Sequence, residues 1–268
     1  MRRIKVGVSI YPQHCGIEDL RGAWREAEQI GVDSIWTWDH FFPLTGDPQG
    51  RHFECWVLLA AMASDTTRPT IGPLVSCVSY RNPDLLADMA RTVDHLAKGR
   101  LVLGLGAGWF EKDYREYGYE FRTAKERIEY LGQSIERIRS RFERLNPPPL
   151  GQIPLLIGGS GERLMLRLVA QHADAWNTFG PVANFKRKAD VLDNWCRHFR
   201  RDPAEIERTV LIQGLATDAW KRELDQLPYY VEASATHFIL GLGYPFEMEP
   251  VRAFVEAAAE LNRTRNNR

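Results

Sequence analysis

The stretch IGVDSIWTWDHFFP, residues 30–43, decides the fold expected for this chain. A helical segment stops at Gly31, and the apolar run of residues 34–38 has the length and composition of a buried strand. That strand ends in an adjacent carboxylate and imidazole, Asp39 and His40. In a barrel of alternating strands and helices, the carboxyl ends of the strands form the mouth where chemistry is done. The alternative is a structural pair, in which Asp39 caps the next turn and orients a buried histidine.

Strand-like and helix-like segments alternate along the whole chain. The expected strands are residues 4–10, 34–38, 70–75, 101–105, 154–157, 175–177, 210–213 and 237–240. The expected helices are residues 18–30, 54–64, 84–96, 124–145, 162–172, 185–200, 219–227 and 251–261. Strands separated by helices pair in parallel, so eight such units predict an α/β fold, a single (β/α)8 TIM-barrel domain over residues 1–268. A doubly wound open sheet is the alternative, because it needs no eighth unit.

The composition excludes some classes of partner. Lys plus Arg equals Asp plus Glu at 35 each, so the chain has no global basic field and we expect no nucleic-acid partner. No window approaches 18 apolar residues, so we expect no membrane span. The cysteines show no C-x-x-C spacing, which predicts reduced thiols, a cytoplasmic protein and no metal site; they are Cys15, Cys55, Cys77 and Cys196.

Two glycine-rich segments follow expected strands. In GLGAGW, residues 104–109, the third glycine of a dinucleotide fingerprint is replaced by Trp109, so the fingerprint fails. Gly106, Ala107 and Gly108 still form a small-residue strand end that lets a ligand approach the backbone. A tight strand-to-helix turn is the alternative.

The second segment is Gly158-Gly159-Ser160-Gly161, which opens an expected helix. Backbone N–H groups, a serine hydroxyl and a helix N-terminus together predict a phosphate site. No lysine follows these glycines, so the segment is not a nucleoside-triphosphate loop. In the alternative, Ser160 is only an N-cap.

Taken together, three segments resemble the luciferase-like superfamily, specifically its coenzyme F420-dependent oxidoreductases. They are DSIWTWDHFFP (33–43), TIGPLVSCVSYRNPDLLADMARTVDHLAKGRLVLGLGAGWFEKDYREYG (70–118) and IPLLIGGSGERLMLRLVAQHADAWNTFG (153–180). The resemblance covers roughly residues 4–180, and the C-terminal third is similar only loosely.

The resemblance implies a TIM barrel, a homodimer, and F420 at the carboxyl-end mouth. F420 is a deazaflavin that carries a phosphate and an acidic glutamyl tail and transfers hydride. His40 would transfer the proton, and Asp39 would orient it or contact the ring. The other residues carried over are Leu74, Val75, Ser76 and Cys77 around a non-proline cis peptide, which we place between Leu74 and Val75; Gly106, Ala107 and Gly108 along the cofactor chain; and Gly158, Gly159, Ser160 and Gly161 at the phosphate.

One departure bears on the substrate. Relatives with sugar-phosphate dehydrogenase activity carry a glutamate where this chain has Trp109, which argues against a sugar-phosphate substrate. Phe41, Trp109 and Trp176 suggest an apolar substrate pocket, although aromatics at strand ends are also ordinary core.

The leading hypothesis is hydride transfer between F420 and a small organic substrate. A monooxygenase using reduced FMN and oxygen is the first alternative, and a non-catalytic F420-binding protein is the second. Arg81 and Arg163 could meet the acidic tail. The expected dimer contact lies on residues 54–64 and 84–96, where the apolar set is Trp56, Leu59, Met62, Leu86 and Met89.

Overall fold

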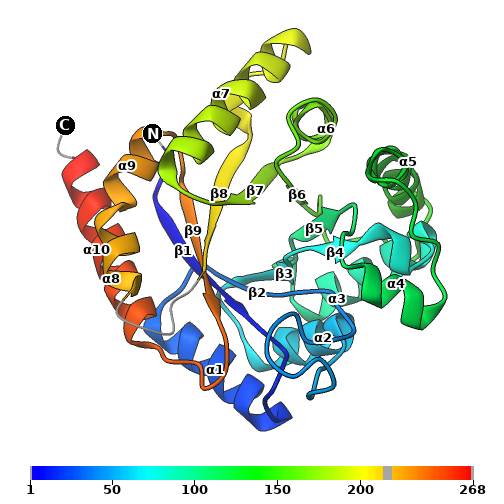
Figure 1. Cartoon of the computed structure of the whole chain (residues 1–268), viewed down its shortest axis with the longest axis horizontal. Coiled ribbons are helices and arrows are strands. Elements are labelled where there is room, and N and C mark those ends of the chain that lie inside the picture. The colour runs from blue at the N-terminus through cyan, green and yellow to red at the C-terminus, as the bar shows by residue number, and fades with distance from the viewer. Residues whose placement is uncertain (1, 214–218, 267–268) are drawn as a thin grey trace.

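A computed structural model describes residues 2–213 and 219–266 of the chain. Its strands all pair in parallel in one sheet, in the order β3-β2-β1-β9-β8-β7-β6-β5-β4 (Figure 1). Their bounds are β1 (Lys5–Ile10), β2 (Ser34–Thr37), β3 (Thr70–Pro73), β4 (Ser76–Cys77), β5 (Leu103–Gly106), β6 (Leu155–Gly158), β7 (Ala175–Phe179), β8 (Glu207–Ile212) and β9 (His237–Leu242).

The two ends of this sheet, β3 and β4, are halves of one strand interrupted at Leu74–Val75. β3 bridges to Leu101 through Ile71, and β4 pairs with the end of β5. The sheet therefore closes on itself as eight strand units. The predicted TIM barrel is confirmed, and the open doubly wound sheet is wrong.

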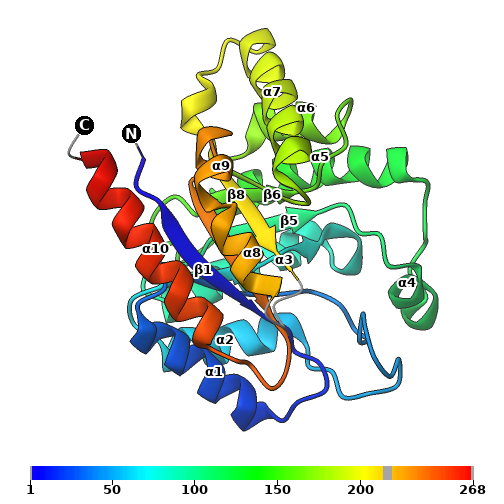
Figure 2. The ribbon, with the colours of Figure 1, turned by 60° about the vertical axis from the view of Figure 1, so that its left-hand side comes forward.

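Helices surround the barrel (Figures 1 and 2). They are α1 (Ile17–Ile30), α2 (Cys55–Asp65), α3 (Pro83–Leu96), α4 (Glu111–Tyr117), α5 (Ala124–Phe142), α6 (Met165–His172), α7 (Val182–His198), α8 (Ala219–Asp225), α9 (Leu227–Glu232) and α10 (Glu249–Asn266), with 3-10 turns η1 (Val78–Tyr80) and η2 (Pro203–Glu205). Gly31 ends α1 in the left-handed conformation, and its N–H binds the carbonyls of Ala27 and Glu28.

The structure differs from the expected elements at five main places. Helices α4 and α9 were not expected, β8 begins at Glu207 instead of residue 210, and α6 begins at Met165 instead of residue 162. The expected strand 70–75 ends earlier, at Pro73, as β3, and the short strand β4 follows beyond its expected end.

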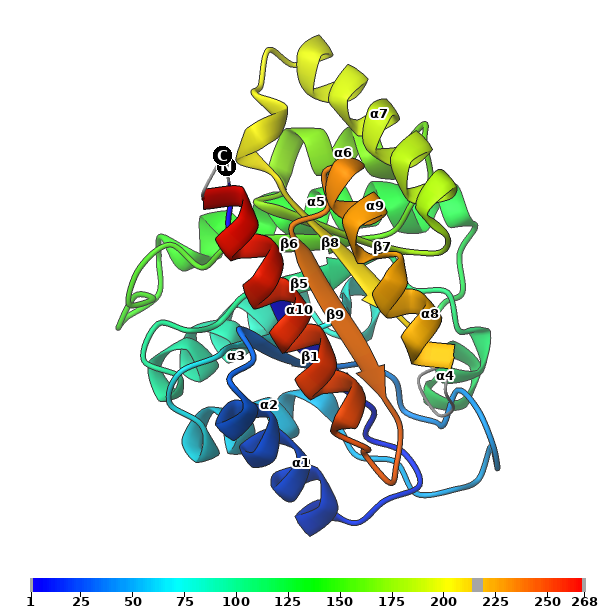
Figure 3. The same cartoon turned by 90° about the vertical axis from the view of Figure 1, so that its left-hand side faces the viewer.

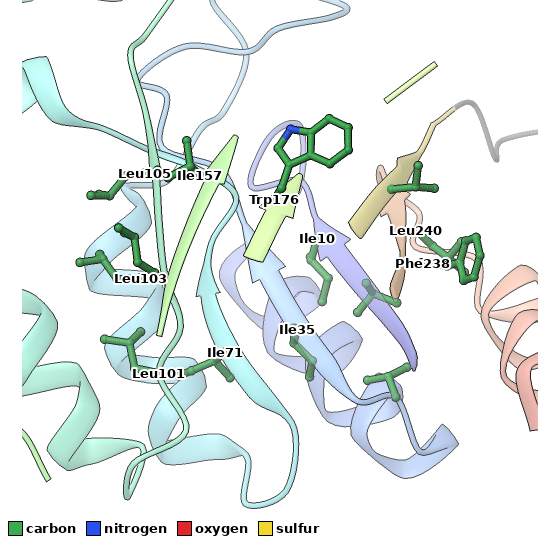
Figure 4. Packing of buried hydrophobic residues seen from close by; sticks show 14 of the residues in the cluster. Ile10, Ile35, Ile71, Leu101, Leu103, Leu105, Ile157, Trp176, Phe238 and Leu240 are labelled. Atoms are coloured by element: carbon green, nitrogen blue, oxygen red, sulfur yellow. The ribbon is translucent and has the colours of Figure 1, made fainter. Parts of the chain in front are cut away.

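Most of the buried apolar side chains fill the layer between the strands and the helices. Figure 4 shows Leu101, Leu103 and Leu105 following one another along the β5 segment at alternate positions, as the twofold period of a strand requires. A second, smaller cluster contains Trp36, Leu156, Ala175 and Ile239, with Leu74, Val75, Val102 and Leu211 packed against it. Because these residues alternate with the outward set, they lie inside the barrel.

Helix α10 packs beside β1 (Figures 2 and 3). Asn262 in α10 exchanges two hydrogen bonds with the backbone of Ile4, at 2.8 and 2.9 Å. No helix within residues 2–213 and 219–266 is long and apolar enough to cross a membrane.

The residues expected at a dimer contact lie elsewhere. Trp56, Leu59, Met62 and Leu86 are buried in the chain's own core, and Met89 packs partly buried against it. Trp56, Leu59, Met62 and Leu86 therefore cannot form a dimer contact, because the chain's own core buries them, whereas a contact elsewhere on α2 and α3 stays a prediction. The homodimer itself stays a prediction.

Candidate active site

Asp39 and His40 follow the end of β2 at the carboxyl-end mouth of the barrel, but their side chains bind different partners. β2 ends at Thr37, so both residues stand outside the regular strand. Asp39 is 1% exposed and binds groups of β4, whereas His40 binds a group on α4. The two side chains therefore belong to different networks.

His40 is oriented by Asp113, a residue of the short helix α4. The distance from His40 Nδ1 to Asp113 Oδ2 is 2.7 Å. Asp113 is fully buried and also accepts hydrogen bonds from Tyr80 Oη at 2.9 Å and from the backbone N–H of Phe41 at 3.1 Å. The prediction that Asp39 orients His40 was wrong, because the chain turns the two side chains toward different walls of the mouth.

Asp39 instead holds the segment that follows β3. Both its oxygens accept from Arg81, at 2.6 and 2.9 Å, and Oδ2 also accepts from Ser76 Oγ at 2.7 Å and from the N–H of Cys77 at 3.1 Å. Burial opposes the charge on Arg81, but the Asp39 carboxylate raises the pKa of this guanidinium above its usual range.

Arg81 also donates to Glu54 at 2.6 Å, and its side chain is only 10% exposed. It is therefore committed to this carboxylate pair. The expectation that Arg81 meets an acidic cofactor tail was wrong.

The peptide bond between Leu74 and Val75 is cis and joins two residues other than proline, as predicted. The Val75 side chain lies against the ends of β5 and β6. A Cβ on Gly106 would come within 2.5 Å of Val75 Cγ2, and one on Gly158 within 3.0 Å of Val75 Cγ1. Packing against Val75 therefore requires glycine at both positions. Leu74 and Val75 pack against the inner barrel cluster and form an apolar surface, called here the Leu74–Val75 deck.

Cys77 and Gly108 meet beneath the loop that leads into α4. The Cys77 Sγ lies 3.2 Å from Tyr114 Oη, and burial raises the pKa of this thiol to about 11. Gly108 has a φ of +77°, and a Cβ there would lie 2.0 Å from Tyr114 Oη. Cys77 is a packed, neutral thiol at neutral pH, not a nucleophile.

The glycine turn after β6 has free donors. Gly159 adopts a φ of +132°, and its carbonyl accepts a hydrogen bond from Trp176 Nε1 at 2.7 Å. Leu164 occupies the N-cap position of helix α6 without a side-chain hydrogen bond, so the alternative that Ser160 is its N-cap is wrong. In the described part of the chain, the N–H groups of Ser160 and Gly161 have no hydrogen-bond acceptor.

Two cations of α7 lie beside this turn, and no local sequence pattern singles them out. Lys188 Nζ lies 2.8 Å from a carboxylate oxygen of Glu162, and Arg187 pairs with the same oxygen. The Lys188 hydrogen bond, with the neighbouring charges, lowers the pKa of Glu162. Arg163, which was expected to meet an acidic tail, is an exposed residue of the same turn.

Trp176 does not line the mouth. It is fully buried and stacks on Phe185 of α7 with ring centroids 5.6 Å apart. Its place in the substrate pocket was a wrong prediction, because along β7 the odd and even positions face opposite sides and Trp176 faces the helices. Its contribution to the site is the hydrogen bond that holds Gly159.

Aromatic rings surround His40 on the open side. The ring of Trp109 lies 5.7 Å from the imidazole between centroids, that of Phe110 5.6 Å and that of Trp38 6.1 Å, each presented edge to face. Trp109 is 63% exposed. Phe41 is half-buried and packs on Tyr117 and Tyr80, beside the Asp113 network.

Trp38 is held between Tyr11 and His52. Its ring stacks on Tyr11 at 4.2 Å, and its Nε1 donates to His52 Nε2 at 3.0 Å. Burial lowers the pKa of His52 to about 4, so this imidazole is neutral and accepts at neutral pH. Asp113 and His52 were not selected from sequence, because only the fold brings them beside residues 38–40.

A sequence model of the family described as luciferase-like monooxygenase matches residues 3–265. An F420-dependent glucose-6-phosphate dehydrogenase of Amycolatopsis mediterranei is 35% identical over 139 residues, 51% of this chain and 41% of that protein. The chain therefore matches less than half the length of that relative.

Two solved structures share the fold. An F420-dependent secondary alcohol dehydrogenase in complex with an F420-acetone adduct superposes with a TM-score of 0.85 at 17% identity, covering 96% of this chain and 99% of that one. An EDTA monooxygenase from Chelativorans sp. BNC1 superposes with a TM-score of 0.73 at 13% identity, covering 98% and 94%. The family match also covers the C-terminal third of the chain, which lies beyond the three segments, within residues 33–180, that carry the resemblance in the sequence. On that match, the chain belongs to the luciferase-like monooxygenase family.

Proposed function

We propose that this protein is an F420-dependent oxidoreductase that transfers a hydride between the deazaflavin and a small organic substrate. The observation that carries the proposal is the His40–Asp113 pair at 2.7 Å, which follows the carboxyl end of β2 at the barrel mouth. An oriented imidazole at the mouth is suited to hydride transfer to a carbonyl, because the substrate oxygen must gain a proton as the carbon gains the hydride. The F420-dependent relatives named above support the choice of cofactor.

The residues present fit such a cofactor. Leu74 and Val75 form an apolar surface at the mouth that suits a planar ring. The free N–H groups of Ser160 and Gly161 suit a phosphate, and Lys188 and Arg187, which share the single carboxylate of Glu162, leave one net positive charge beside them. When bound, F420 supplies the hydride.

The chain's own residues supply the rest of the chemistry. His40 gives a proton to the substrate oxygen during reduction and takes it back during oxidation. Trp109, Phe110 and Trp38 exclude water from the imidazole, which strengthens its interaction with a developing charge. Arg81 and Asp39 fix the backbone of Ser76 and Cys77, so that the deck keeps its place.

The proposal is tested by titrating the purified protein with F420 and, separately, with FMN. We expect micromolar or tighter binding of F420 and weaker binding of FMN, since FMN lacks the acidic tail. Oxidation of reduced F420 by a panel of ketones then tests catalysis. Tighter FMN binding would favour the monooxygenase, and F420 binding without turnover of any acceptor would favour a cofactor-binding protein.

His40→Ala tests the chemical step within the same assay. Its loss should lower kcat by about 10²–10⁴-fold with only a modest loss of F420 affinity. Full turnover of His40→Ala would show that His40 is structural.

A further inference from the structure

We propose that Asp113 is a positioning residue that fixes the tautomer of His40, so that Nε2 of His40 is the atom that exchanges a proton with the substrate. This inference rests on the proposed function and deepens it.

The hydrogen-bond roles around Asp113 leave one assignment. The carboxylate can only accept, and it faces the backbone N–H of Phe41, the hydroxyl of Tyr80 and Nδ1 of His40. Burial raises the pKa of Tyr80, so its hydroxyl keeps its proton and donates. Nδ1 of His40 must therefore carry a proton in both charge states of the ring, and in the neutral ring the lone pair lies on Nε2.

Nε2 faces the open side of the site. It has no hydrogen-bond partner among residues 2–213 and 219–266, and the nearest ring systems, Trp109 and Phe110, present no acceptor to it. The His40 side chain is 13% exposed although Asp113 is fully buried, so the free nitrogen is the part of the pair that a substrate can reach.

The proton balance of the step follows from this assignment. In reduction, the substrate carbon accepts a hydride with its two electrons, its oxygen accepts the proton from Nε2, and the imidazolium becomes neutral imidazole. In oxidation, Nε2 accepts the hydroxyl proton as the hydride leaves the carbon. Nδ1 keeps its proton toward Asp113 throughout. The aspartate of a Ser-His-Asp triad holds its histidine in one tautomer in the same way.

Asp113→Asn should invert this arrangement. The N–H of Phe41 is fixed in the backbone and needs an acceptor, so the amide oxygen turns toward it. The NH2 group then faces Nδ1 of His40, which must become an acceptor, and the ring proton moves to Nε2. The shape of the site is retained. In the neutral ring, however, Nε2 already carries the proton and can no longer accept one from the substrate.

The first test needs no cofactor. In the full-length protein labelled with 15N histidine, the imidazole signals assigned to His40 by their loss in His40→Ala should show Nδ1 protonated and Nε2 unprotonated at high pH. Asp113→Asn should exchange these signatures, whereas Glu116→Gln, an exposed change on the same helix, should leave them unchanged. An Nε2-protonated neutral His40 in the unchanged protein would overturn the proposal, and this result does not depend on F420.

The second test measures turnover with reduced F420 and a ketone. Asp113→Asn should lower kcat by about 10²-fold or more, with KM and F420 affinity changed by only a few-fold, and Asp113→Glu should recover part of the loss because it restores an acceptor. Equal kcat in Asp113→Asn and Glu116→Gln would overturn the proposal. Should Asp113→Asn not fold, Tyr80→Phe removes one anchor of the carboxylate, and the wild-type NMR result still decides. Failure of F420 to bind at all would instead contradict the proposed function.

Discussion

Replacing Arg81 by leucine should destabilise the protein and make the Leu74–Val75 deck less well ordered. Arg81 binds both oxygens of Asp39, whose side chain has no exposed surface. Asp39 in turn accepts from Ser76 Oγ and from the N–H of Cys77, immediately after the interruption between β3 and β4. The substitution leaves a buried carboxylate with two of its four hydrogen bonds and no cation.

The cost follows from burial. Removing one partner of a buried ion pair costs about 3–5 kcal/mol, because the remaining charge is left uncompensated. Ser76 and the Cys77 N–H still bind Asp39, so the lower end of that range, about 3 kcal/mol, is expected. The contact with Glu54 adds at most about 1 kcal/mol, since that side chain is 38% exposed.

Urea unfolding followed by tryptophan fluorescence measures the loss, with F420 affinity as the second readout. Arg137→Leu is the matched control, because Arg137 pairs with Asp84 at a surface site where solvent screens the charges, and its loss should cost little stability. Adding Asp39→Asn to Arg81→Leu removes the uncompensated charge and should recover part of the stability. A loss in Arg81→Leu no larger than in Arg137→Leu, or no recovery in the double variant, would refute the reasoning.

Four further predictions concern the phosphate turn, the pocket, the barrel floor and the assembly. Ser160→Ala should weaken F420 binding several-fold, at about 1 kcal/mol, and Gly159→Val should weaken it more because a φ of +132° excludes a branched side chain; unchanged affinity in a folded Gly159→Val protein would exclude this turn. Trp109→Ala should raise the KM of an aromatic ketone more than that of acetone, and an equal effect on both would remove Trp109 from the pocket. At the amino-terminal end of the barrel, where a cavity of about 320 Å³ lies, burial opposes ionisation of Glu207, but His237 and Lys5 lower its pKa to about 2. Because this pKa is below the usual 4.5, Glu207 stabilises the fold above pH 4.5, and its contribution, about 3 kcal/mol, should be lost as the pH falls from 4.5 to 2; a Glu207→Gln protein with the same acid profile would contradict this. Light scattering at micromolar concentration should give twice the 30.8 kDa of one chain, and a monomer mass would dispose of the homodimer.

The barrel could be predicted because each unit repeats a local signal, an apolar run followed by a stripe of apolar residues at helical spacing. The signal fails where the interior is polar. β8 begins with Glu207, Arg208 and Thr209, of which Arg208 and Thr209 are buried, so its first half does not have the composition of a buried strand. Helix α4 has only seven residues and no apolar stripe, and it was missed for that reason.

The site was predicted in part for a related reason. The sequence shows which residues end a strand, but a twofold period does not say which set faces the helices. Trp176 was placed in the pocket and lies under α7, while its neighbour Asn177 binds Thr209. Asp113 is 73 residues from His40 in sequence, and no local pattern connects two residues at that separation.

The carboxylates of Asp39 and Asp113 have different electrostatic partners, and this difference separates their roles. Asp39 faces a guanidinium that is always charged, so its charge is balanced whatever happens at the mouth. Among the described residues, Asp113 faces neutral donors from Tyr80 and the Phe41 backbone, and a single group, His40, whose charge changes during proton transfer. A buried carboxylate whose neighbouring charge appears and disappears with the reaction acts on the transition state, whereas one with a permanent partner acts on the fold. Changes at Arg81 should therefore appear in stability and cofactor affinity, and changes at Asp113 in kcat.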